Sequence, residues 1–401
     1  MNPIALFHRE PDLYLKEFLH AYTQGIPVFL GNPQWNEAEM HAAAQLIPQG
    51  THIEGEAPAP LGRAPENWPE LWPDAVFIPT GGTGGKIKFV HHQKKTLRAA
   101  VTSLRDAIVA RQHSGILHGA IFTPVYHVSG LMPALRAWET KGQFEIHTGK
   151  FHPESTLPEI QLPTEGTRLA SLVPTQLHRI LQNPHGVDWL KQFHVILLGG
   201  SAVPATELEA IRQHRLPVYI TYGMTETAAV CAWCPPEKIW AGEGVHGFPL
   251  PKVHFTAINQ RLCINSPALG LGYWPNEKIG TPYLTGDLGV VFRDGAVQVH
   301  GRADRIIVTG GEKVNPAEVE KILLSNPECR EVHVFGSADP EWGERIVACV
   351  VGDKNQAKAL IETAQTLPPF ARPKDYLFVT KIPLDDRGKF DRRTAEKLLR
   401  G

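Results

Sequence analysis

The densest group of residues that could hold a phosphate follows Ala75–Ile78, an apolar run that predicts a buried strand. The segment reads Thr80-Gly81-Gly82-Thr83-Gly84-Gly85-Lys86-Ile87-Lys88. Its glycines let successive backbone N–H groups point into one concavity, and its threonines and lysines add donors for phosphate oxygens. It is not a Walker A loop, because Thr80 replaces the first glycine and Ile87 replaces the Ser or Thr after the lysine. We predict a phosphate-binding loop, with a simple glycine turn as the alternative.

A second candidate is Tyr222-Gly223-Met224-Thr225-Glu226-Thr227, which follows the predicted strand Val218–Thr221. A hydroxyl and a carboxylate side by side at a strand end suit a Mg²⁺ ion held among nucleotide phosphates. On its own, the Thr-Glu pair could equally cap a helix.

A third candidate combines Thr285-Gly286-Asp287 with Gly301-Arg302. An aspartate can accept hydrogen bonds from both hydroxyls of a ribose, and Arg302 could complete that contact. Taken alone, the pair is better explained as a turn aspartate and a surface arginine.

A fourth candidate is Lys389, within Gly388-Lys389-Phe390 near the C-terminal end of the sequence. A lysine beside a glycine is a compact cation that can enter and leave a site. Taken alone, it is better explained as part of a solvated charge run.

The elements that must position these groups follow a strand–helix alternation. The predicted strands are Ala75–Ile78, Ala120–Thr123, Leu169–Val173, His194–Leu198 and Val218–Thr221, and the predicted helices are Asp12–Thr23, Lys94–Arg111 and Thr175–Gln182. This pattern predicts a large α/β layered domain with mainly parallel sheets. Ligands of such domains bind at the carboxyl ends of the strands, which is where the candidate loops lie.

After about Gly242 the sequence pattern changes and indicates turns and short alternating strands. This pattern predicts a β-rich subdomain. Asp294-Gly295 is a hairpin signal within it. After Gly301–Arg305 we predict a small α+β unit with the helices Pro316–Leu324 and Gln356–Ala364 and the strands Val332–Phe335 and Ile346–Val351.

The bulk composition fits a globular protein that acts on small molecules. A chain of 401 residues is longer than one ordinary domain with a single core. Its 42% hydrophobic and 20% charged residues are typical of folded chains. A net charge of −1 gives no strong field toward nucleic acid or an anionic membrane. No apolar run approaches the roughly 18 residues of a membrane span.

The cysteines and the first residues predict a cytoplasmic protein. The N-terminal ten residues have no basic and apolar regions of a secretory signal. Five scattered cysteines indicate reduced thiols. Cys231 and Cys234 have redox or zinc spacing, but no second such pair exists, and we favour two small, partly buried thiols.

Together, the order and spacing of these segments resemble the adenylate-forming superfamily of acyl-CoA ligases, peptide-synthetase adenylation domains and luciferases. Further segments that carry the resemblance are Pro124–Gly130, Gly199-Gly200-Ser201, Gly301–Arg305, Thr309–Glu320 and Gly388-Lys389. The resemblance runs from about Phe77 to Arg393. Any single match is weak, whereas the ordered set is specific.

The resemblance implies ATP, Mg²⁺ and coenzyme A as the small molecules used, and it assigns roles to individual residues. Lys389 would contact the carboxylate and α-phosphate, Thr225 and Glu226 would act in catalysis with Glu226 on Mg²⁺, and His127 would gate the acyl pocket. The nucleotide-binding residues would be Thr80, Gly81, Gly82, Thr83, Gly84, Lys88, Gly200, Ser201, Thr221, Tyr222, Gly223, Met224, Thr225, Asp287 and Arg302. Without the resemblance, His127 is better explained as a satisfied core histidine.

The same resemblance implies a domain movement between two half-reactions. Residues 1–303 would form the adenylation domain and residues 304–401 a mobile C-terminal domain that turns about Asp304. In the second orientation, Gly310 and Gly311 would lie against the pantetheine of coenzyme A. Oligomeric state stays open, with a homodimer as one option.

Within the superfamily, the chain is most similar to o-succinylbenzoate–CoA ligases. The region before the phosphate loop is short, the loop ends Ile87-Lys88-Phe89 where the superfamily usually has Pro-Lys-Gly, and Ser171–Leu181 resembles a segment that borders the acyl pocket in those ligases. That substrate has a second carboxylate, which needs donors if it is buried. Ser171, Arg179 and His178 are the candidates, and Gly199 would also line the acid site. The alternatives are another acid–CoA ligase, a stand-alone adenylation domain, and a nucleotide-binding module without turnover.

Overall fold

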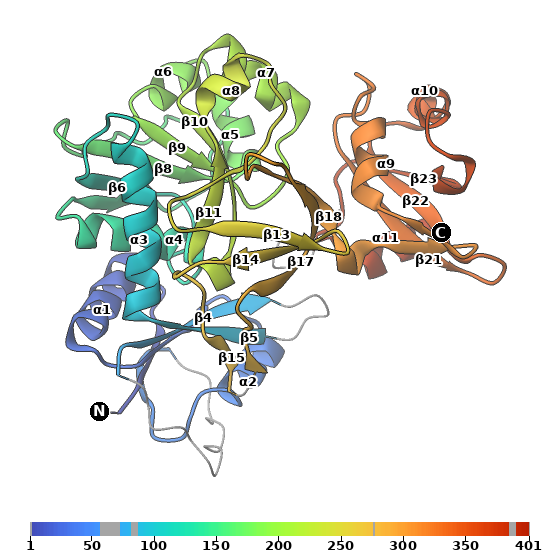
Figure 1. Cartoon of the computed structure of the whole chain (residues 1–401). Coiled ribbons are helices and arrows are strands. Elements are labelled where there is room, and N and C mark those ends of the chain that lie inside the picture. The colour runs from blue at the N-terminus through green and yellow to red at the C-terminus, as the bar shows by residue number, and fades with distance from the viewer. Residues whose placement is uncertain (1, 57–72, 82–86, 276, 385–389, 401) are drawn as a thin grey trace. The chain divides into compact units, whose positions relative to one another are not determined.

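The computed structural model describes residues 2–56, 73–81, 87–275, 277–384 and 390–400 (Figure 1). The chain divides into two compact units. The first comprises Met1–Thr256, Cys263–Leu284 and Val291–Gln298, and the second comprises Ala257–Leu262, Thr285–Val290 and Val299–Gly401. The functional division at residues 303 and 304 stays a prediction.

The first sheet of unit one has seven strands in the order β16-β15-β5-β4-β2-β1-β3. They are β1 (Ile4–Phe7), β2 (Val28–Leu30), β3 (His52–Gly55), β4 (Ala75–Gly81), β5 (Ile87–Gln93), β15 (Gly272–Trp274) and β16 (Glu277–Lys278). Strands β1 to β4 pair in parallel, whereas β5 is antiparallel to both β4 and β15. A strand from late in the chain therefore extends a sheet built by its beginning (Figure 1).

Aromatic packing fixes β15 in this sheet. The Trp274 ring meets Phe29 and Phe77 edge-on, with centroid distances of 5.9 and 4.9 Å, and those two rings stack at 4.1 Å. The indole N–H of Trp274 donates to the Leu46 carbonyl at 2.8 Å. Because side chains alternate along a strand, burying Trp274 turns Tyr273 to the opposite face of the sheet.

The second sheet of unit one has the order β12-β11-β10-β9-β8-β6-β7. Its strands are β6 (Leu117–Ile121), β7 (Phe144–Ile146), β8 (Thr167–Leu172), β9 (Val195–Leu198), β10 (Val218–Met224), β11 (Ala229–Cys234) and β12 (Phe248–Pro249). From β7 to β10 all neighbours pair in parallel. Their carboxyl ends therefore share one edge, and four of the sequence segments predicted to bind ligands lie there.

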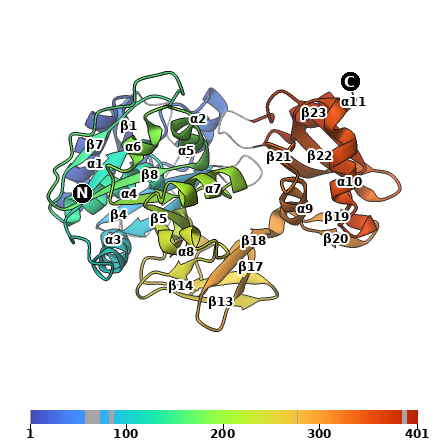
Figure 2. The same ribbon diagram turned by 90° about the horizontal axis from the view of Figure 1, so that it is seen from above.

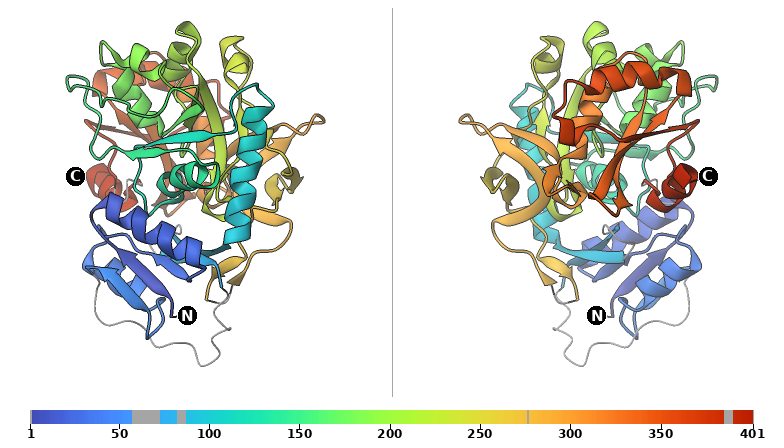
Figure 3. Two further views of the ribbon diagram at one scale, coloured as in Figure 1. Left: turned by 90° about the vertical axis from the view of Figure 1, so that its left-hand side faces the viewer. Right: turned by 90° about the vertical axis from the view of Figure 1, so that its right-hand side faces the viewer.

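Helices cover both faces of this second sheet. One core joins α1 (Pro11–Gln24), α3 (Lys94–Val109) and α4 (Val128–Glu139) to strands of both sheets, and Figure 3 shows α3 as the long helix beside them. Another core joins β8, β9 and β10 to α5 (Pro174–Leu181), α6 (Gly186–Leu190) and α7 (Ala205–Gln213). Figure 2 labels β8 and these three helices. The remaining helices of this unit are α2 (Glu37–Ala44) and α8 (Pro236–Trp240). The predicted α/β layers are thus confirmed.

A four-stranded sheet has the order β13-β14-β17-β18, and it corresponds to the predicted β-rich subdomain. Its strands are β13 (His254–Ile258), β14 (Arg261–Asn265), β17 (Tyr283–Val291) and β18 (Val297–Arg302). Gly295 has φ of +85° in the β17–β18 turn, and Phe292 and Ala296 pair across it. The hairpin predicted from Asp294-Gly295 is confirmed.

Unit two contains an α+β sheet in the order β20-β19-β22-β21, with β23 beside β22. Its elements are β19 (Ile307–Thr309), β20 (Glu312–Val314), β21 (Val332–Asp339), β22 (Gly343–Val351), β23 (Asp375–Val379), α9 (Pro316–Leu323), α10 (Ala357–Ala364) and α11 (Arg392–Arg400). Gly310 and Gly311 form the two-residue turn between β19 and β20, with φ of +57° and +83°. Positive φ at both positions is the reason this hairpin uses two glycines.

Among the described residues, no helix is both long and apolar enough to span a membrane.

Candidate active site

The segment after β10 makes a tight reversal into β11 through the short helix Thr225–Thr227. The buried Thr227 hydroxyl accepts from the Met224 N–H and donates to the Ala229 carbonyl at 2.7 Å. A Cβ on Gly223 would lie 1.8 Å from that carbonyl oxygen, so only glycine fits beside it. These constraints set the position of Thr225 and Glu226, which are both half-buried.

Glu226 is held by its backbone and by its side chain. Its carbonyl accepts from the Gly270 N–H at 2.8 Å. Its carboxylate oxygen Oε1 accepts from the Tyr273 hydroxyl, and the Tyr273 and Tyr283 hydroxyls lie 2.9 Å apart. Burial, followed by the Glu226 charge, raises the pKa of Tyr273, so the phenol keeps its proton and donates it.

Lys88 reaches the same place from β5. Its Nζ lies 4.6 Å from the centroid of the Tyr273 ring and 3.1 Å from the Glu277 carboxylate. Thr80 is the register partner of Lys88 across the β4–β5 pair. The predicted phosphate loop therefore joins two antiparallel strands, with Gly81 ending β4, whereas Gly82, Thr83 and Gly84 lie outside the described residues.

His92 fixes the backbone that precedes Glu226. Its Nε2 donates to the Thr225 carbonyl at 2.8 Å, and its Nδ1 lies 3.0 Å from the Thr96 hydroxyl. The ring is fully buried, and burial lowers its pKa to about 4. His92 is therefore neutral at pH 7, which suits one donated and one accepted hydrogen bond.

The loop Gly199-Gly200-Ser201 follows β9 and lies next to β10. Thr221 donates its hydroxyl proton to the Leu198 carbonyl at 3.0 Å, and a Cβ on Gly199 would lie 2.4 Å from that hydroxyl. Gly200 has φ of +94°. The structure thus places Gly199, Gly200 and Thr221 at one edge of the sheet, and the Tyr222 ring contacts Phe255 at 6.0 Å.

The residues predicted to bind the acid are spread over three elements. Ser171 lies near the carboxyl end of β8 and is half-buried, whereas His127 is exposed just before α4 and touches the Tyr126 ring. Arg179 is exposed near the C-terminal end of α5. His178 is also on α5, where its Nδ1 is hydrogen-bonded to the buried carboxylate of Glu207. That partner makes His178 a poor donor to a second carboxylate.

In unit two, Arg302 joins two aspartates. Its Nη1 lies 3.5 Å from Asp287 Oδ1, and its Nε and Nη2 donate to the two Asp304 oxygens at 3.1 and 2.8 Å. A Cβ on Gly286 would lie 2.7 Å from Arg302 Nη2, which explains the glycine beside Asp287. The structure therefore brings together the residues predicted for ribose binding and the predicted hinge residue.

Lys389 lies outside the described residues, and the structure shows what its next neighbour contacts. Phe390 stacks on His333 with ring centroids 3.9 Å apart, and it pairs with Leu384 in an isolated bridge. His333 is in turn 3.3 Å from Arg305 Nη2, which donates to Glu320 at 2.6 Å.

The Cys231 and Cys234 thiols lie on β11 and are buried. Cys231 donates to the Tyr222 carbonyl, and burial raises the pKa of Cys234 to about 11. A thiol that keeps its proton favours the predicted packing role over a redox or zinc role. Within the described parts of the chain, no three His, Cys, Asp or Glu side chains gather as metal ligands.

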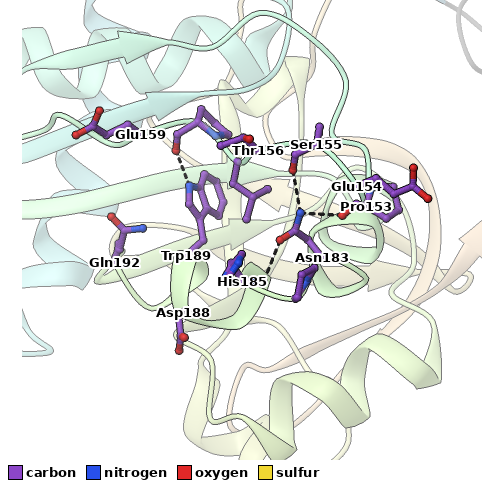
Figure 4. Close-up of a pocket in the computed structure, with 13 residues that line it drawn as sticks. Pro153, Glu154, Ser155, Thr156, Glu159, Asn183, His185, Asp188, Trp189 and Gln192 are labelled. Carbon is purple, nitrogen blue, oxygen red and sulfur yellow. Dashed lines mark hydrogen bonds between the residues drawn. The ribbon is translucent and has the colours of Figure 1, made fainter.

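A groove of about 680 Å³ lies elsewhere in unit one, between the segment 153–159 and helix α6 (Figure 4). Two of its polar side chains donate to the backbone of the segment beside them. Asn183 donates to the Pro153 and Ser155 carbonyls at 2.8 and 2.9 Å, and the Trp189 indole donates to the Pro158 carbonyl at 2.7 Å. None of the residues predicted to do chemistry lines this groove.

The sequence matches the AMP-binding enzyme family over residues 27–274 and the C-terminal domain of AMP-binding enzymes over residues 318–389. The first match alone covers more than half of the chain. The chain belongs to the AMP-binding enzyme family. The adenylate-forming superfamily inferred from the motifs is thereby confirmed.

Two curated relatives of this AMP-binding enzyme share one name. The 2-succinylbenzoate–CoA ligase of Lactococcus lactis is 28% identical over 325 residues, which cover 80% of this chain and 70% of the relative. The ligase of the same name from Geobacillus kaustophilus is 29% identical over 296 residues, covering 69% and 60%. The match thus spans less than two thirds of some of these relatives.

Solved structures share the fold of this AMP-binding enzyme. The o-succinylbenzoate CoA synthetase of Bacillus subtilis, in complex with its acyl-adenylate intermediate, has a TM-score of 0.75 at 21% identity, covering 98% of this chain and 87% of that one. ATP-bound MatB of Rhodopseudomonas palustris has a TM-score of 0.76 at 20% identity, covering 99% and 88%. At these identities the likeness concerns the fold, and it confirms the predicted fold class.

Sequence reasoning missed the residues that hold Glu226 and Thr225 in this AMP-binding enzyme, namely Tyr273 and His92. His92 follows the phosphate loop, and Tyr273 lies about 50 residues after Glu226. A single polar residue in a short apolar run carries no spacing signal, so only the strand pairing reveals these contacts.

Proposed function

We propose that the protein is an ATP-dependent o-succinylbenzoate–CoA ligase. The observation that carries this proposal is the combination of family membership with relatives that share one name and match most of this chain. The reaction has two steps. The acid carboxylate attacks the α-phosphorus of ATP and diphosphate leaves; the CoA thiol then attacks the acyl carbon and AMP leaves.

The nucleotide would lie along the carboxyl edge of the second sheet. We assign Gly200, Ser201 and Tyr222 to the adenine, because they follow β9 and β10 at that edge. Asp287 and Arg302 are assigned to the ribose. Thr80 and Lys88 are assigned to the β- and γ-phosphates, as a hydroxyl and a cation that are register partners on β4 and β5.

Glu226 fits a Mg²⁺ ion that is carried in by the nucleotide. Mg²⁺ usually takes one or two carboxylates together with substrate phosphates and water, and Glu226 supplies one half-buried carboxylate beside the Thr225 hydroxyl. When bound, the ion would neutralise charge that builds up on the phosphate oxygens.

The protein's own groups would then stabilise the transition state of the first step by fixed positive charge. Negative charge grows on phosphoryl oxygens during the attack, and preorganised donors account for much of the catalysis in such reactions. Lys389 is assigned to the α-phosphate and the acid carboxylate. His127 is assigned to the entrance of the acyl pocket.

For the second carboxylate of the acid, we favour Ser171 as a donor, because it is half-buried at the carboxyl end of β8. His178 is less suitable, since it already pairs with Glu207. Arg179 would need a long reach from its exposed position on α5.

For the second step, we propose that residues 304–401 turn about Asp304 and bring Gly310 and Gly311 to the pantetheine chain. A tight glycine turn offers backbone N–H groups without side chains in the way. A cytoplasmic location is part of the proposal, as is a homodimer as one option for the assembly.

The experiment is a diphosphate-release assay with a panel of acids, with and without CoA. We expect o-succinylbenzoate to exceed benzoate, succinate and medium-chain fatty acids, with full turnover only when CoA is present. Better turnover of a fatty acid would contradict the proposed substrate, whereas the proposed reaction class would stand. Full turnover onto a carrier protein without CoA would indicate a stand-alone adenylation domain. An absence of diphosphate release with every acid would indicate a nucleotide-binding module without turnover.

A further inference from the structure

Tyr273 contacts two groups that come from separate predicted motifs. Its hydroxyl donates to Glu226, and its ring lies under the Lys88 ammonium. We propose that Tyr273 is a positioning residue that aims the Glu226 carboxylate at the nucleotide-borne metal ion. This inference rests on the proposed function.

The contact uses one carboxylate oxygen. Oε1 of Glu226 accepts from Tyr273, and no hydrogen bond from a described residue reaches Oε2. A carboxylate fixed at one oxygen cannot rotate freely, so its other oxygen keeps one direction. Fixing a ligand through a second hydrogen-bonded group is a general way to raise metal affinity, and loss of such a partner typically costs about 10- to 100-fold.

The donor cannot easily reverse its role. An ionised carboxylate has no proton to give, so the Tyr273 hydroxyl donates and Glu226 accepts. Tyr283 is the second phenol, 2.9 Å from the Tyr273 hydroxyl. The tyrosines thus form a short chain that ends on Glu226.

The ring of Tyr273 is held from its own strand. Tyr273 pairs with Val90 and Trp274 with Phe89, so β15 is a neighbour of β5, which carries Lys88. Trp274 is buried among Phe29 and Phe77. A cation over a tyrosine face is favourable, and Glu277 adds an ion pair to the same lysine.

The test compares Tyr273→Phe with Tyr283→Phe, two variants that each lose one phenolic oxygen. Mn²⁺ replaces Mg²⁺ as the probe, and its binding in the presence of a non-hydrolysable ATP analogue is followed by electron paramagnetic resonance. We expect Tyr273→Phe to raise the Mn²⁺ dissociation constant at least about 10-fold, and Tyr283→Phe to change it less than about 3-fold.

Binding of the analogue in EDTA shows that each variant still folds its nucleotide site, and it should change less than about 2-fold. In a Glu226→Gln background, Tyr273→Phe should add less than about 2-fold to the Mn²⁺ effect, because the carboxylate it aims is gone. An unchanged Mn²⁺ constant for Tyr273→Phe would overturn the inference, as would equal losses with and without metal.

These outcomes separate the inference from the proposed function. If the wild-type protein releases no diphosphate with any acid, the proposed function fails, and Mn²⁺ binding still decides the role of Tyr273. If the wild type is active and Tyr273→Phe binds Mn²⁺ normally, the function stands and the positioning role fails.

Discussion

Unit one contains two polar regions that use their hydrogen bonds differently. In the first, which we call the Glu226 corner (Glu226, Tyr273, Tyr283 and Lys88), side chains from separate strands gather around Tyr273, which donates to the Glu226 carboxylate. In the second, the Asn183 groove (segment 153–159 with Asn183 and Trp189), side-chain donors are bonded to the backbone of the loop beside them.

The difference shows how a functional site can be distinguished from a cavity without a chemical role. The groove is a cavity, yet the Asn183 amide and the Trp189 indole use their donors on the backbone of the loop beside them. The corner is defined by the charges that meet there. Charge concentrated at the edge of a sheet indicates function better than empty volume does.

The largest effect on activity is expected from a substitution in the Glu226 corner. Glu226→Gln removes the charge while keeping the shape of the side chain, and we expect adenylate formation to fall on the order of 10²-fold, the scale for losing one strong electrostatic contact. Diphosphate release with saturating acid measures it. The matched control is Glu159→Gln in the groove, which should leave the rate unchanged; equal losses would erase the distinction between the two regions.

The next effect concerns the pH dependence of stability that His91 and His92 cause. His92 and His91 each have a pKa of about 4 in the folded protein because burial disfavours the charged ring, against 6.5 when unfolded. Between pH 4 and pH 6.5 the unfolded chain binds more protons than the folded protein. The contribution of these histidines to the free energy of unfolding is therefore fully present above about pH 6.5 and is lost as the pH falls toward 4. Each histidine contributes about 3 kcal/mol to this loss.

Urea unfolding at pH 7 and pH 4.5 measures that slope. His92→Gln should flatten the slope, because the glutamine does not titrate, whereas Asn183→Ala should lower stability equally at both pH values. A slope that is unaffected by His92→Gln would show that His92 is not the titrating group.

The smallest effect concerns the groove alone. Asn183 is 8% exposed, and its side chain makes three hydrogen bonds, to Pro153, Ser155 and His185. Asn183→Ala leaves their backbone groups unsatisfied, and we expect a loss of about 1–3 kcal/mol in stability with unchanged ligation. Asp188→Ala, an exposed change in the same groove, should stay within roughly 0.5 kcal/mol. A large loss of activity in Asn183→Ala would make the groove part of the site.

Much of the fold could be predicted, because buried parallel strands appear as apolar runs. Ala75–Ile78 and Val218–Thr221 predicted β4 and β10, and both strands are confirmed. The first 55 residues gave few signals, yet they form β1, β2 and β3. These strands have three or four residues, too few for periodicity to appear.

The site was predictable where a motif is contiguous and not where it depends on pairing. Thr225 and Glu226 adjoin in sequence, so they could be proposed together as site residues. Tyr273 meets Glu226 only because β15 adds to β5, and pairing between distant strands leaves no local signal. For the same reason, the sequence did not reveal that His178 is paired, because its partner Glu207 lies on another helix.

The addition of β15 to β5 also affects how the chain assembles as it is made. Gly272 pairs with His91, about 180 residues earlier. At roughly 5–20 residues per second, β5 emerges from the ribosome roughly 10–40 s before its neighbour. During that interval β5 is an open edge of the first sheet, and open edges invite wrong partners. The first sheet of unit one is therefore completed late in synthesis, after β15 and β16 have been made.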